Sequence, residues 1–436
     1  MAKKTQIVIV GGGAGGLELA RRLGARYGRR NHDIILIDRN RTHIWKPLLH
    51  EVAAGSLDAN LDEVGYGGHG ARWGYRFFNG TLESIDRRAR TVTTTPMLDS
   101  GGAEIIGRHT IRYDYLVLAI GGVSNSFSVP GVEEHCLFLE TRDQADVFHQ
   151  RLLNQCLRVS HISETTLEKP NVRVCIIGGG ATGVELAAEL FNAAESLRNY
   201  GLEIFDASRM KVTLLEAGPR ILPALPEKLA DAARAELVDK GISVITSAQV
   251  ASVQQNSVTT RGGQTIDADI IVWAAGVKGS PLLKSLGGLE ADGADRLVVK
   301  QTLQTPLDDR IFAIGDCCAC PQPGSDRPVP PRAQAAHQMA LSVYRNLVRA
   351  MDNKPAEPFV YHDHGSLVSL SRYSTVGSLM GNLVGGRMAI EGRLARLAYL
   401  SLYRMHLVGI HGWPRGVMLI VVGHVNQIVR PKLKVH

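Results

Sequence analysis

A short apolar run, a glycine-rich turn and an apolar-periodic segment follow one another at the start of the chain. Residues 6–10 are apolar and mostly β-branched, as in a buried parallel strand, and Gly11, Gly13 and Gly16 come next. The first glycine of such a turn allows a positive φ, the second lets a pyrophosphate approach the backbone, and the third lets helix and strand pack closely. Asp38 ends the next apolar run, where a carboxylate can accept hydrogen bonds from ribose hydroxyls. The sequence therefore predicts a dinucleotide-binding unit.

The same pattern occurs a second time in the middle of the chain. Residues 172–177 form another apolar run, and the three glycines of a turn follow it: Gly178, Gly180 and Gly183. The acid after the next run is Glu216, which favours the ribose hydroxyls of NAD(H) over the 2′-phosphate of NADP(H), although Arg220 lies nearby. Two such sites in one chain predict a bound flavin paired with a diffusing nicotinamide nucleotide.

Three further apolar runs each stop at a glycine or the residue after it, as strands do when they end at a bound ligand. They are residues 115–121, 270–276 and 310–316, which end in Gly121, Gly276 and Asp316. We expect the first two to close the two nucleotide-binding modules. After the third, the pattern predicts a helix over residues 332–347, directly after two prolines.

Length, charge and cysteine content narrow the classes further. A chain of 436 residues predicts two or more modules, since single domains average roughly 150 residues. The formal net charge is +7, and residues 387–436 carry all of it, with eight Lys or Arg against one acid. The six cysteines have no disulfide spacing and the start shows no signal-peptide pattern, so we expect the reducing cytoplasm.

The basic tail is also apolar. Leucine and tyrosine side chains alternate with Arg393, Arg396 and Arg404, and no run is long enough to span a bilayer. Pro414 and Gly416 are expected to split the tail into two short helices, which suit the surface of an anionic membrane. A tail that binds nucleic acid would be richer in polar residues. A dimer or domain interface is the alternative for the same helix pair.

The order of the glycine-rich blocks, GGGAGG, LVLAIGG, GGGATGVE, IVWAAGV and FAIGD, resembles the flavoprotein family with two dinucleotide-binding domains. Within it, HIWKPLLHEVAAGSLD, EAGPRILPALP, PPRAQAAHQMA and DHGSLVSLSRYSTVGSLMGNL resemble the bacterial type II NADH dehydrogenases, respiratory NADH:quinone oxidoreductases that do not pump protons. The resemblance implies an α/β fold with two Rossmann-like domains, the NADH domain inserted in the FAD domain. It places the FAD domain at residues 1–170 and 290–350, the NADH domain at 171–289 and a membrane-binding region at 351–436.

The resemblance implies FAD as a tightly bound, non-covalent cofactor. Its pyrophosphate would lie on Gly11, Gly13 and Gly16, its adenosine ribose on Asp38, and its ribityl or pyrophosphate region on Asp316. The helix after Asp316 would point its positive end at the flavin ring and stabilise the anion formed when the ring accepts hydride.

The resemblance also implies sites for NADH and for a quinone, either ubiquinone or menaquinone. NADH would contact Gly178, Gly180, Gly183 and Glu216. Glu185 would face the nicotinamide carboxamide. The alternative is a glutamate that lies in the first turn only because the helix dipole favours an acid there. Gln334 and His337, three residues apart on one helical face, would contact the quinone, and His337 would help to protonate the quinol. A packed histidine is the alternative for His337.

Missing cysteines argue against two related chemistries. Residues 42–55 contain no cysteine, so the redox-active cysteine pair of the disulfide reductases is absent. Sulfide:quinone reductases need a cysteine in the C-terminal part of the chain, and here no cysteine follows Cys320. Cys317, Cys318 and Cys320 are too close in sequence to ligate one tetrahedral zinc, so we predict no metal site; copper(I) would be the softer alternative.

Three alternatives to the quinone reductase stay open: a soluble NADH oxidase or ferredoxin-type reductase, a non-enzymatic interaction protein on a flavin scaffold, and a sulfide:quinone reductase. The basic apolar tail favours the quinone reductase, because a soluble enzyme has no need of it. We therefore expect a peripheral membrane protein on the cytoplasmic face of the bacterial inner membrane.

Overall fold

The computed structural model describes residues 4–28, 32–99, 101–166, 170–197, 207–370, 375–381, 386–391 and 403–429. The chain divides into two compact units, each assembled from three segments. The first unit consists of Met1–Trp45, Glu63–Val123 and Val277–His362. The second consists of Lys46–Asp62, Ser124–Gly276 and Asp363–His436.

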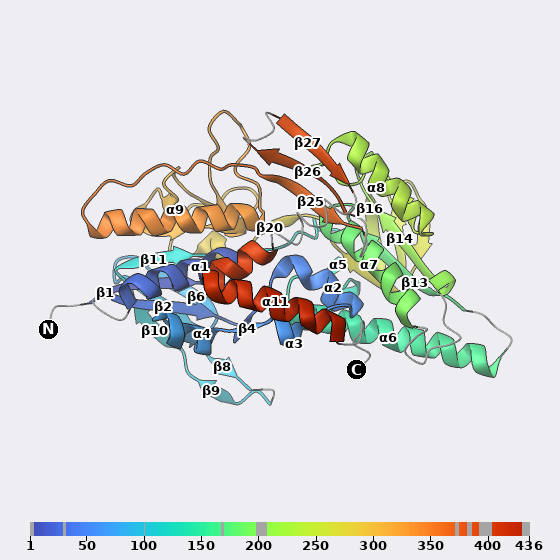
Figure 1. The fold of residues 1–436 in the computed structure, drawn as a ribbon, viewed down its shortest axis with the longest axis horizontal. Helices are drawn as coiled ribbons and strands as arrows, with labels where there is room; N and C mark the ends of the chain where they lie inside the picture. Colours follow the sequence, from blue (N-terminus) through green and yellow to red (C-terminus); the bar gives the residue numbers. More distant parts are fainter. Residues whose placement is uncertain are drawn as a thin grey trace. The chain divides into compact units, whose positions relative to one another are not determined.

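A six-stranded sheet forms the centre of the first unit, in the order β22-β23-β11-β1-β2-β5. Its strands β1, β2 and β11 are labelled in Figure 1. Its strands are β1 (Thr5–Val10), β2 (His32–Asp38), β5 (Arg76–Asn79), β11 (Tyr115–Leu118), β22 (Gln304–Thr305) and β23 (Asp308–Ala313). All neighbours pair in parallel except β22, which is antiparallel to β23. The apolar runs of β1 and β11 are buried, as expected for parallel strands covered on both faces.

Two long helices of the first unit pack against each other and place the candidate site. Helix α1 (Ala14–Leu23) starts directly after the first glycine turn, and α9 (Ala333–Met351) starts two residues after Pro331. They approach closely because Gly15 has no side chain: a Cβ there would lie 2.8 Å from the carbonyl oxygen of Ala336. The start of α9 is one residue later than predicted, at Ala333.

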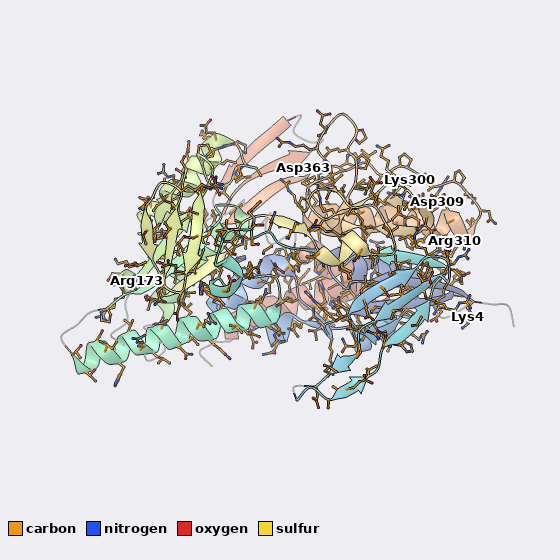
Figure 2. The ribbon with its side chains drawn as sticks, turned by 180° about the vertical axis from the view of Figure 1, so that it is seen from behind. Lys4, Arg173, Lys300, Asp309, Arg310 and Asp363 are labelled. Atoms are coloured by element: carbon orange, nitrogen blue, oxygen red, sulfur yellow. The ribbon has the colours of Figure 1, made fainter. Side chains whose placement is uncertain are left out.

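Smaller elements complete the first unit. An antiparallel sheet joins β6 (Leu82–Asp86), β7 (Thr91–Thr94) and β10 (His109–Arg112). Helix α4 (Tyr66–Trp73) packs against β5. Short pairs are β3 (Thr42–His43) with β4 (Val64–Gly65), β8 (Met97–Leu98) with β9 (Glu104–Ile106), and β21 (Leu297–Val298) with β24 (Cys318–Ala319). Exposed ion pairs such as Lys300 with Asp309, 2.7 Å apart, lie on the surface (Figure 2) and contribute little stability.

The second unit repeats the parallel-sheet plan on a smaller scale, with strand order β15-β14-β13-β19. Its strands are β13 (Val172–Ile177), β14 (Met210–Leu215), β15 (Ser243–Ile245) and β19 (Ile270–Trp273), all parallel. An antiparallel sheet of β16 (Val250–Gln254), β17 (Ser257–Thr260) and β18 (Thr265–Asp267) follows. Arg173 at the start of β13, labelled in Figure 2, pairs with Asp269.

Helices surround this smaller sheet. They are α2 (Leu49–Ala54), α3 (Ala59–Asp62), α5 (Val132–His135), α6 (Arg142–Thr165), α7 (Ala181–Leu197) and α8 (Glu227–Asp239). Helix α6 begins at a capping box, in which the Gln144 amide N–H donates to the Thr141 hydroxyl and the Thr141 N–H donates to the Gln144 side chain. Helix α2 packs against both α6 and α7, which brings residues far apart in the sequence together.

The C-terminal segment belongs to the second unit. Strands β25 (Gly365–Ser369), β26 (Thr375–Gly381) and β27 (Gly386–Glu391) form an antiparallel sheet, and two helices follow, over residues 403–411 and α11 (Trp413–Val429). The predicted pair of helices is present, but the break predicted at Pro414 and Gly416 is wrong: it lies at Gly412, which has φ 75°. Pro414 sits in the first turn of α11, where the absent N–H is not needed.

Among the residues that the structure describes, no helix is long and apolar enough to cross a membrane. The arginines at 393 and 396 and the basic residues at 430, 432 and 434 lie outside the described residues. The fold confirms the predicted α/β class with two Rossmann-like parallel sheets.

Candidate functional site

The three glycines of the first turn have the surroundings that their spacing predicts: two lie close to backbone atoms and one is open. Gly11 has φ 104°, and a Cβ there would lie 2.2 Å from the carbonyl oxygen of Ala119. A Cβ on Gly16 would lie 1.9 Å from the carbonyl oxygen of Gly11, so only glycine lets α1 pack this close to the strand. A Cβ on Gly13 would meet no described atom within 4 Å. The turn therefore leaves an open approach to its backbone at the second glycine, which fits a pyrophosphate.

Asp38 is held beside this turn. Its Oδ2 accepts a hydrogen bond of 2.6 Å from the Gly12 amide, and its Oδ1 accepts one of 2.7 Å from the Asn40 amide. Sequence reasoning missed two residues that hold the other side of Gly12: the Tyr66 hydroxyl donates to its carbonyl oxygen at 2.8 Å, and His43 Nδ1 lies 2.9 Å from the same oxygen. Burial raises the pKa of Tyr66, which keeps it a neutral donor.

The second glycine turn reproduces this geometry. Gly178 has φ 116°, and a Cβ on Gly183 would lie 2.0 Å from the carbonyl oxygen of Gly178. A Cβ on Gly180 would meet no described atom within 4 Å. Glu216 occupies the place of Asp38: Oε2 accepts from the Gly179 amide at 2.7 Å, and Oε1 accepts from the Gly218 amide at 2.6 Å.

The glycines predicted at strand ends adopt conformations that require glycine. Gly121, after β11, has φ 73°, and Gly276, after β19, has φ 69°. A Cβ on Gly276 would lie 2.6 Å from the ring of Phe127. Asp316 is half-buried in the short 3-10 helix η6 (Gly315–Cys317), next to Gly122, the first residue of β12 (Gly122–Ser124).

A buried glutamate pairs with one of the predicted quinone residues. His337 on α9 forms an ion pair through Nδ1 with Glu18 of α1, and Arg22 Nη2 lies 2.7 Å from the same carboxylate. Burial alone would raise the pKa of Glu18, but the hydrogen bonds and charges of His337 and Arg22 hold it below its usual range. Gln334 and His337 are both half-buried, one turn apart on α9.

The predicted nicotinamide residue has a histidine partner that the sequence did not identify. Glu185 of α7 is 7% exposed, and its Oε2 lies 3.7 Å from Nδ1 of His50 on α2. Its other oxygen accepts a hydrogen bond of 3.1 Å from the Ser369 amide. Burial raises the pKa of Glu185 to about 8 and lowers that of His50 to about 4. His50 lies in the block HIWKPLLHEVAAGSLD, which carried the resemblance but gave no role to this residue.

The three clustered cysteines are buried thiols. Cys317 donates to the carbonyl oxygen of Leu118, and burial raises the pKa of Cys317 and of Cys320 to about 12. Cys318 contacts the sulfur of Met339, 3.9 Å away. Thiols held in this state are poor nucleophiles and poor metal ligands. Within the described ranges, no three His, Cys, Asp or Glu side chains gather in a way that could hold a metal ion.

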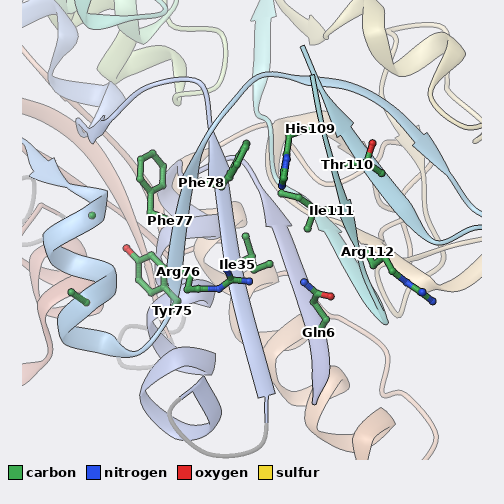
Figure 3. Close-up of a pocket in the computed structure, with 12 residues that line it drawn as sticks. Gln6, Ile35, Tyr75, Arg76, Phe77, Phe78, His109, Thr110, Ile111 and Arg112 are labelled. Carbon is green, nitrogen blue, oxygen red and sulfur yellow. The ribbon is translucent and has the colours of Figure 1, made fainter. Parts of the chain in front are cut away.

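A surface cavity of about 600 Å³ in the first unit lies away from these residues (Figure 3). Gln6, Ile35, Phe78, His109 and Arg112 line it, and the Phe78 and His109 rings stack 4.9 Å apart. Gln6 is near the start of β1, whereas the glycine turn follows the end of that strand. Nucleotides bind at the carboxyl ends of parallel strands, so this cavity is not part of the candidate site.

The residues present fit two dinucleotides. Each turn offers an open glycine backbone at the start of a helix, where the amide dipoles favour a pyrophosphate, and an acid beside the turn for a ribose. Such an arrangement can hold one nucleotide cofactor and one nucleotide substrate. The chemistry between them is then that of the cofactor, and the protein supplies binding, orientation and charge.

Comparisons with known proteins agree with this geometry. The model of the pyridine nucleotide-disulphide oxidoreductase family matches residues 5–340. The type II NADH:quinone oxidoreductase of Haemophilus influenzae is 43% identical over 442 residues, covering 99% of both chains. The enzyme of that name from Staphylococcus aureus is 30% identical over 392 residues, covering 88% of this chain and 92% of the relative.

A solved structure supports the fold over the whole length. NDH2 from Plasmodium falciparum in complex with NADH has a TM-score of 0.81 and 17% identity, covering 99% of this chain and 100% of that one. At this identity the likeness concerns the fold. The sequence matches go further, and this chain belongs to the pyridine nucleotide-disulphide oxidoreductase family and, within it, to the type II NADH:quinone oxidoreductases.

Proposed function

We propose that this chain catalyses respiratory NADH:quinone oxidoreduction, in which hydride from NADH reduces bound FAD and two electrons then reach a membrane quinone without proton pumping. The observation that carries this function is the pair of glycine turns, each with an open second glycine and an acid bridging its backbone. A relative that is 43% identical over 99% of the chain bears the same activity in its name.

The first turn is assigned to FAD. Gly11, Gly13 and Gly16 hold the pyrophosphate, Asp38 holds the adenosine ribose, and Gly121 and Asp316 complete the site at neighbouring strand ends. When bound, FAD supplies the two-electron redox chemistry that links NADH to the quinone. Asp38 can keep the hydrogen bond from the Gly12 amide while it binds the ribose, because its two carboxylate oxygens have further lone pairs that can accept from the ribose hydroxyls.

The second turn is assigned to NADH. Gly178, Gly180 and Gly183 hold the pyrophosphate, Glu216 selects the ribose without a 2′-phosphate, and Gly276 ends the strand beside them. Glu185 faces the nicotinamide carboxamide. Its position in the second turn of α7, with one oxygen fixed by the Ser369 amide, supports this role.

Gln334 and His337 are assigned to the quinone. Glu18 holds Nδ1 of His337, so Nε2 is the ring nitrogen left to face a ligand. The contact with Glu18 orients the ring, and a histidine oriented in this way suits a proton donor to a reduced quinone. Gln334, one turn earlier on α9, offers an amide to a quinone carbonyl.

The C-terminal helices are assigned to the membrane surface. Large apolar side chains on α11 are exposed at helical spacing: Trp413, Val417, Met418, Val421 and Val422. Trp413 is 72% exposed, and Arg404 and Arg415 are exposed nearby in sequence. An apolar face flanked by arginines binds an anionic leaflet, here the cytoplasmic face of the bacterial inner membrane. A homodimer interface is the alternative for this face.

The function is tested by anaerobic mixing of the FAD-loaded protein with NADH and then with a soluble quinone, while the flavin absorbance is followed. NADH should bleach the flavin and the quinone should restore its colour. A flavin that NADH leaves oxidised, or that only sulfide bleaches, would contradict the proposal. Gln334→Ala should slow the recovery with quinone and leave the bleaching by NADH fast, because the glutamine is assigned to the quinone alone.

The membrane assignment has its own test. Trp413→Ser combined with Val421→Ser should reduce flotation with vesicles that contain anionic lipid, because serine buries less apolar area in the lipid than tryptophan or valine. Val360→Ser is the matched control, because Val360 is also half-exposed but lies in the first unit. If the double variant floats as the wild type does and forms the same fraction of dimer, the exposed face of α11 does not bind the membrane.

A further inference from the structure

A buried histidine faces the glutamate that follows the second glycine turn. Helix α2 packs on α7 within the second unit, and this contact places His50 Nδ1 3.7 Å from Glu185 Oε2. His50 is 4% exposed and Glu185 is 7% exposed. A separation of 3.7 Å is just beyond a direct hydrogen bond, so a small rotation of either side chain brings the two atoms into range.

The groups around this pair are acids, backbone atoms and a second histidine. Helix α2 adds Glu51, whose Oε1 lies 4.0 Å from His50 Nε2, and α7 adds Glu189, one turn beyond Glu185. Strand β25 adds the Ser369 amide, the ring of His50 donates to the carbonyl oxygen of Pro47, and α6 adds His149, which contacts the carbonyl oxygen of Ala53. In the described part of the chain, no Lys or Arg pairs with Glu185.

These surroundings decide how many protons the pair holds. Burial opposes charge on both side chains, and the nearby carboxylates Glu51 and Glu189 further disfavour a negative Glu185. The pKa of Glu185, raised to about 8, and that of His50, lowered to about 4, therefore describe a pair that keeps one proton at neutral pH, mainly on the carboxyl group. In this state Glu185 is a neutral acid facing the lone pair of an imidazole nitrogen.

On the basis of the proposed role of Glu185 at the nicotinamide, we propose that His50 is a positioning residue that shares one proton with Glu185, and that the pair releases this proton when the oxidised, positively charged nicotinamide binds. The charge of the oxidised ring stabilises the carboxylate, whereas the reduced ring is neutral and does not. The proton and NAD⁺ therefore compete for the site. A protonated pair weakens the binding of the product and leaves the binding of the reduced nucleotide unchanged.

The test is calorimetry of NAD⁺ binding to the FAD-loaded, oxidised protein in two buffers with different ionisation enthalpies. At pH 7 we expect the release of about one proton for each NAD⁺ bound. The Kd for NAD⁺ should fall about tenfold for each unit of rising pH until Glu185 is ionised in the unliganded protein. Tetrahydro-NAD, a neutral analogue that cannot donate hydride, should bind without proton release. Binding of NAD⁺ without proton release would overturn the proposal.

Variants separate the two side chains. Glu185→Gln should abolish proton release. His50→Asn replaces the imidazole nitrogen that faces the protonated carboxyl group by a less basic amide oxygen, so the neutral acid should be stabilised less and the midpoint of the pH dependence should fall. His149→Asn is the control, since this buried histidine also contacts α2 but does not contact Glu185. If His50→Asn does not fold, His50→Gln serves in its place.

The outcomes keep this inference apart from the proposed function. A wild-type midpoint in the His50 variant, with normal bleaching of the flavin by NADH, overturns the role of His50 and leaves the function standing. A flavin that NADH does not bleach overturns both. A lowered midpoint together with normal bleaching supports both.

Discussion

The two glycine turns carry a glutamate at the same offset, and the two glutamates are in opposite states of charge. Glu18 follows Gly16 as Glu185 follows Gly183, each is buried, and each faces a histidine from a different helix. Glu18 also has Arg22, one turn along α1, and its pKa is lowered. Glu185 has Glu189 at the corresponding position, and its pKa is raised.

The side chains around each glutamate account for the difference. Burial opposes ionisation of both, but the hydrogen bond and charge of His337, with those of Arg22, lower the pKa of Glu18. No such cation faces Glu185 in the described part of the chain, and Glu51 and Glu189 add repulsion to its burial. The first turn thus has a fixed negative charge that anchors His337, and the second has a carboxyl group that can gain or lose a proton. The first arrangement suits a resident cofactor, and the second suits a substrate whose charge changes during the reaction.

Substitution of the third glycine of each turn should have the largest effect on the stability of the protein. Gly16→Ala and Gly183→Ala each push a Cβ to within 2.0 Å of a backbone oxygen, which cannot move aside. We expect each to lower the free energy of unfolding by about 3 kcal/mol, measured by urea denaturation. Only Gly16→Ala should also lose bound flavin.

The second glycine of each turn provides the control. Gly13→Ala and Gly180→Ala place a Cβ in open space, so the stability of the cofactor-free protein should change by less than about 1 kcal/mol. Gly13→Ala should reduce the flavin content, and Gly180→Ala should weaken NADH binding. Equal loss of flavin from both variants would contradict the assignment of the two turns.

The two glutamates should respond differently to loss of the carboxyl group. Glu18→Gln removes the charge that His337 and Arg22 share, and both of these side chains are one-third exposed, so we expect a cost of about 2 kcal/mol. Glu185→Gln replaces a neutral acid by a neutral amide and should cost less than about 1 kcal/mol. Thermal and urea unfolding at pH 6.5 measure the two losses of stability. Equal losses in Glu18→Gln and Glu185→Gln would contradict the different charge states of the two glutamates.

The two turns should also differ in the pH dependence of stability. The raised pKa of Glu185 means that the folded protein holds a proton that the unfolded chain has lost, so stability falls as pH rises from about 5 to about 8. Glu185→Gln should remove on the order of 1 to 2 kcal/mol of this decline. Glu18 acts in the other direction: its lowered pKa contributes stability that is lost as pH falls below its ordinary range near 4.5. If the stability of Glu185→Gln still declines between pH 5 and 8, a group other than Glu185 causes the decline.

Substitution of the acid beside each turn should have the smallest effect, which we expect in the choice between NADH and NADPH. Glu216→Gln removes the charge that repels a 2′-phosphate and keeps an oxygen acceptor for only one of the Gly179 and Gly218 amides. The preference for NADH over NADPH should narrow by about tenfold, or about 1.4 kcal/mol, in stopped-flow flavin reduction. Asp38→Asn in the first turn is the control and should leave this ratio unchanged.

The parallel strands and their turns could be predicted because local chemistry determines them. Strand β13 coincides with the predicted residues 172–177, and β1 differs only by Thr5, since a strand buried on both faces is a continuous apolar run. The break between the C-terminal helices was misplaced by two residues. The sequence predicts the break at the proline, but a proline fits in the first turn of a helix, and Gly412 ends the preceding helix instead.

The histidine partners could not be predicted, because they depend on helix contacts between distant parts of the chain. His50 and Glu185 meet through the packing of α2 on α7, and His337 and Glu18 meet through the packing of α9 on α1. A sequence signal did exist for the glutamates, which recur at one offset in GGGAGGLE and GGGATGVE. Their different charge became apparent only with their neighbours in place.

The most direct measurement of the central contrast is the infrared carbonyl band of a protonated carboxylic acid, which a carboxylate lacks. In the oxidised protein at pH 6.5, a difference spectrum against Glu185→Gln should show this band, because Glu185 is the protonated member of the pair of glutamates. A difference spectrum against Glu18→Gln should lack it. If Glu185→Gln leaves the band unchanged, or if Glu18→Gln removes it, the opposite charge states of the two turns are contradicted.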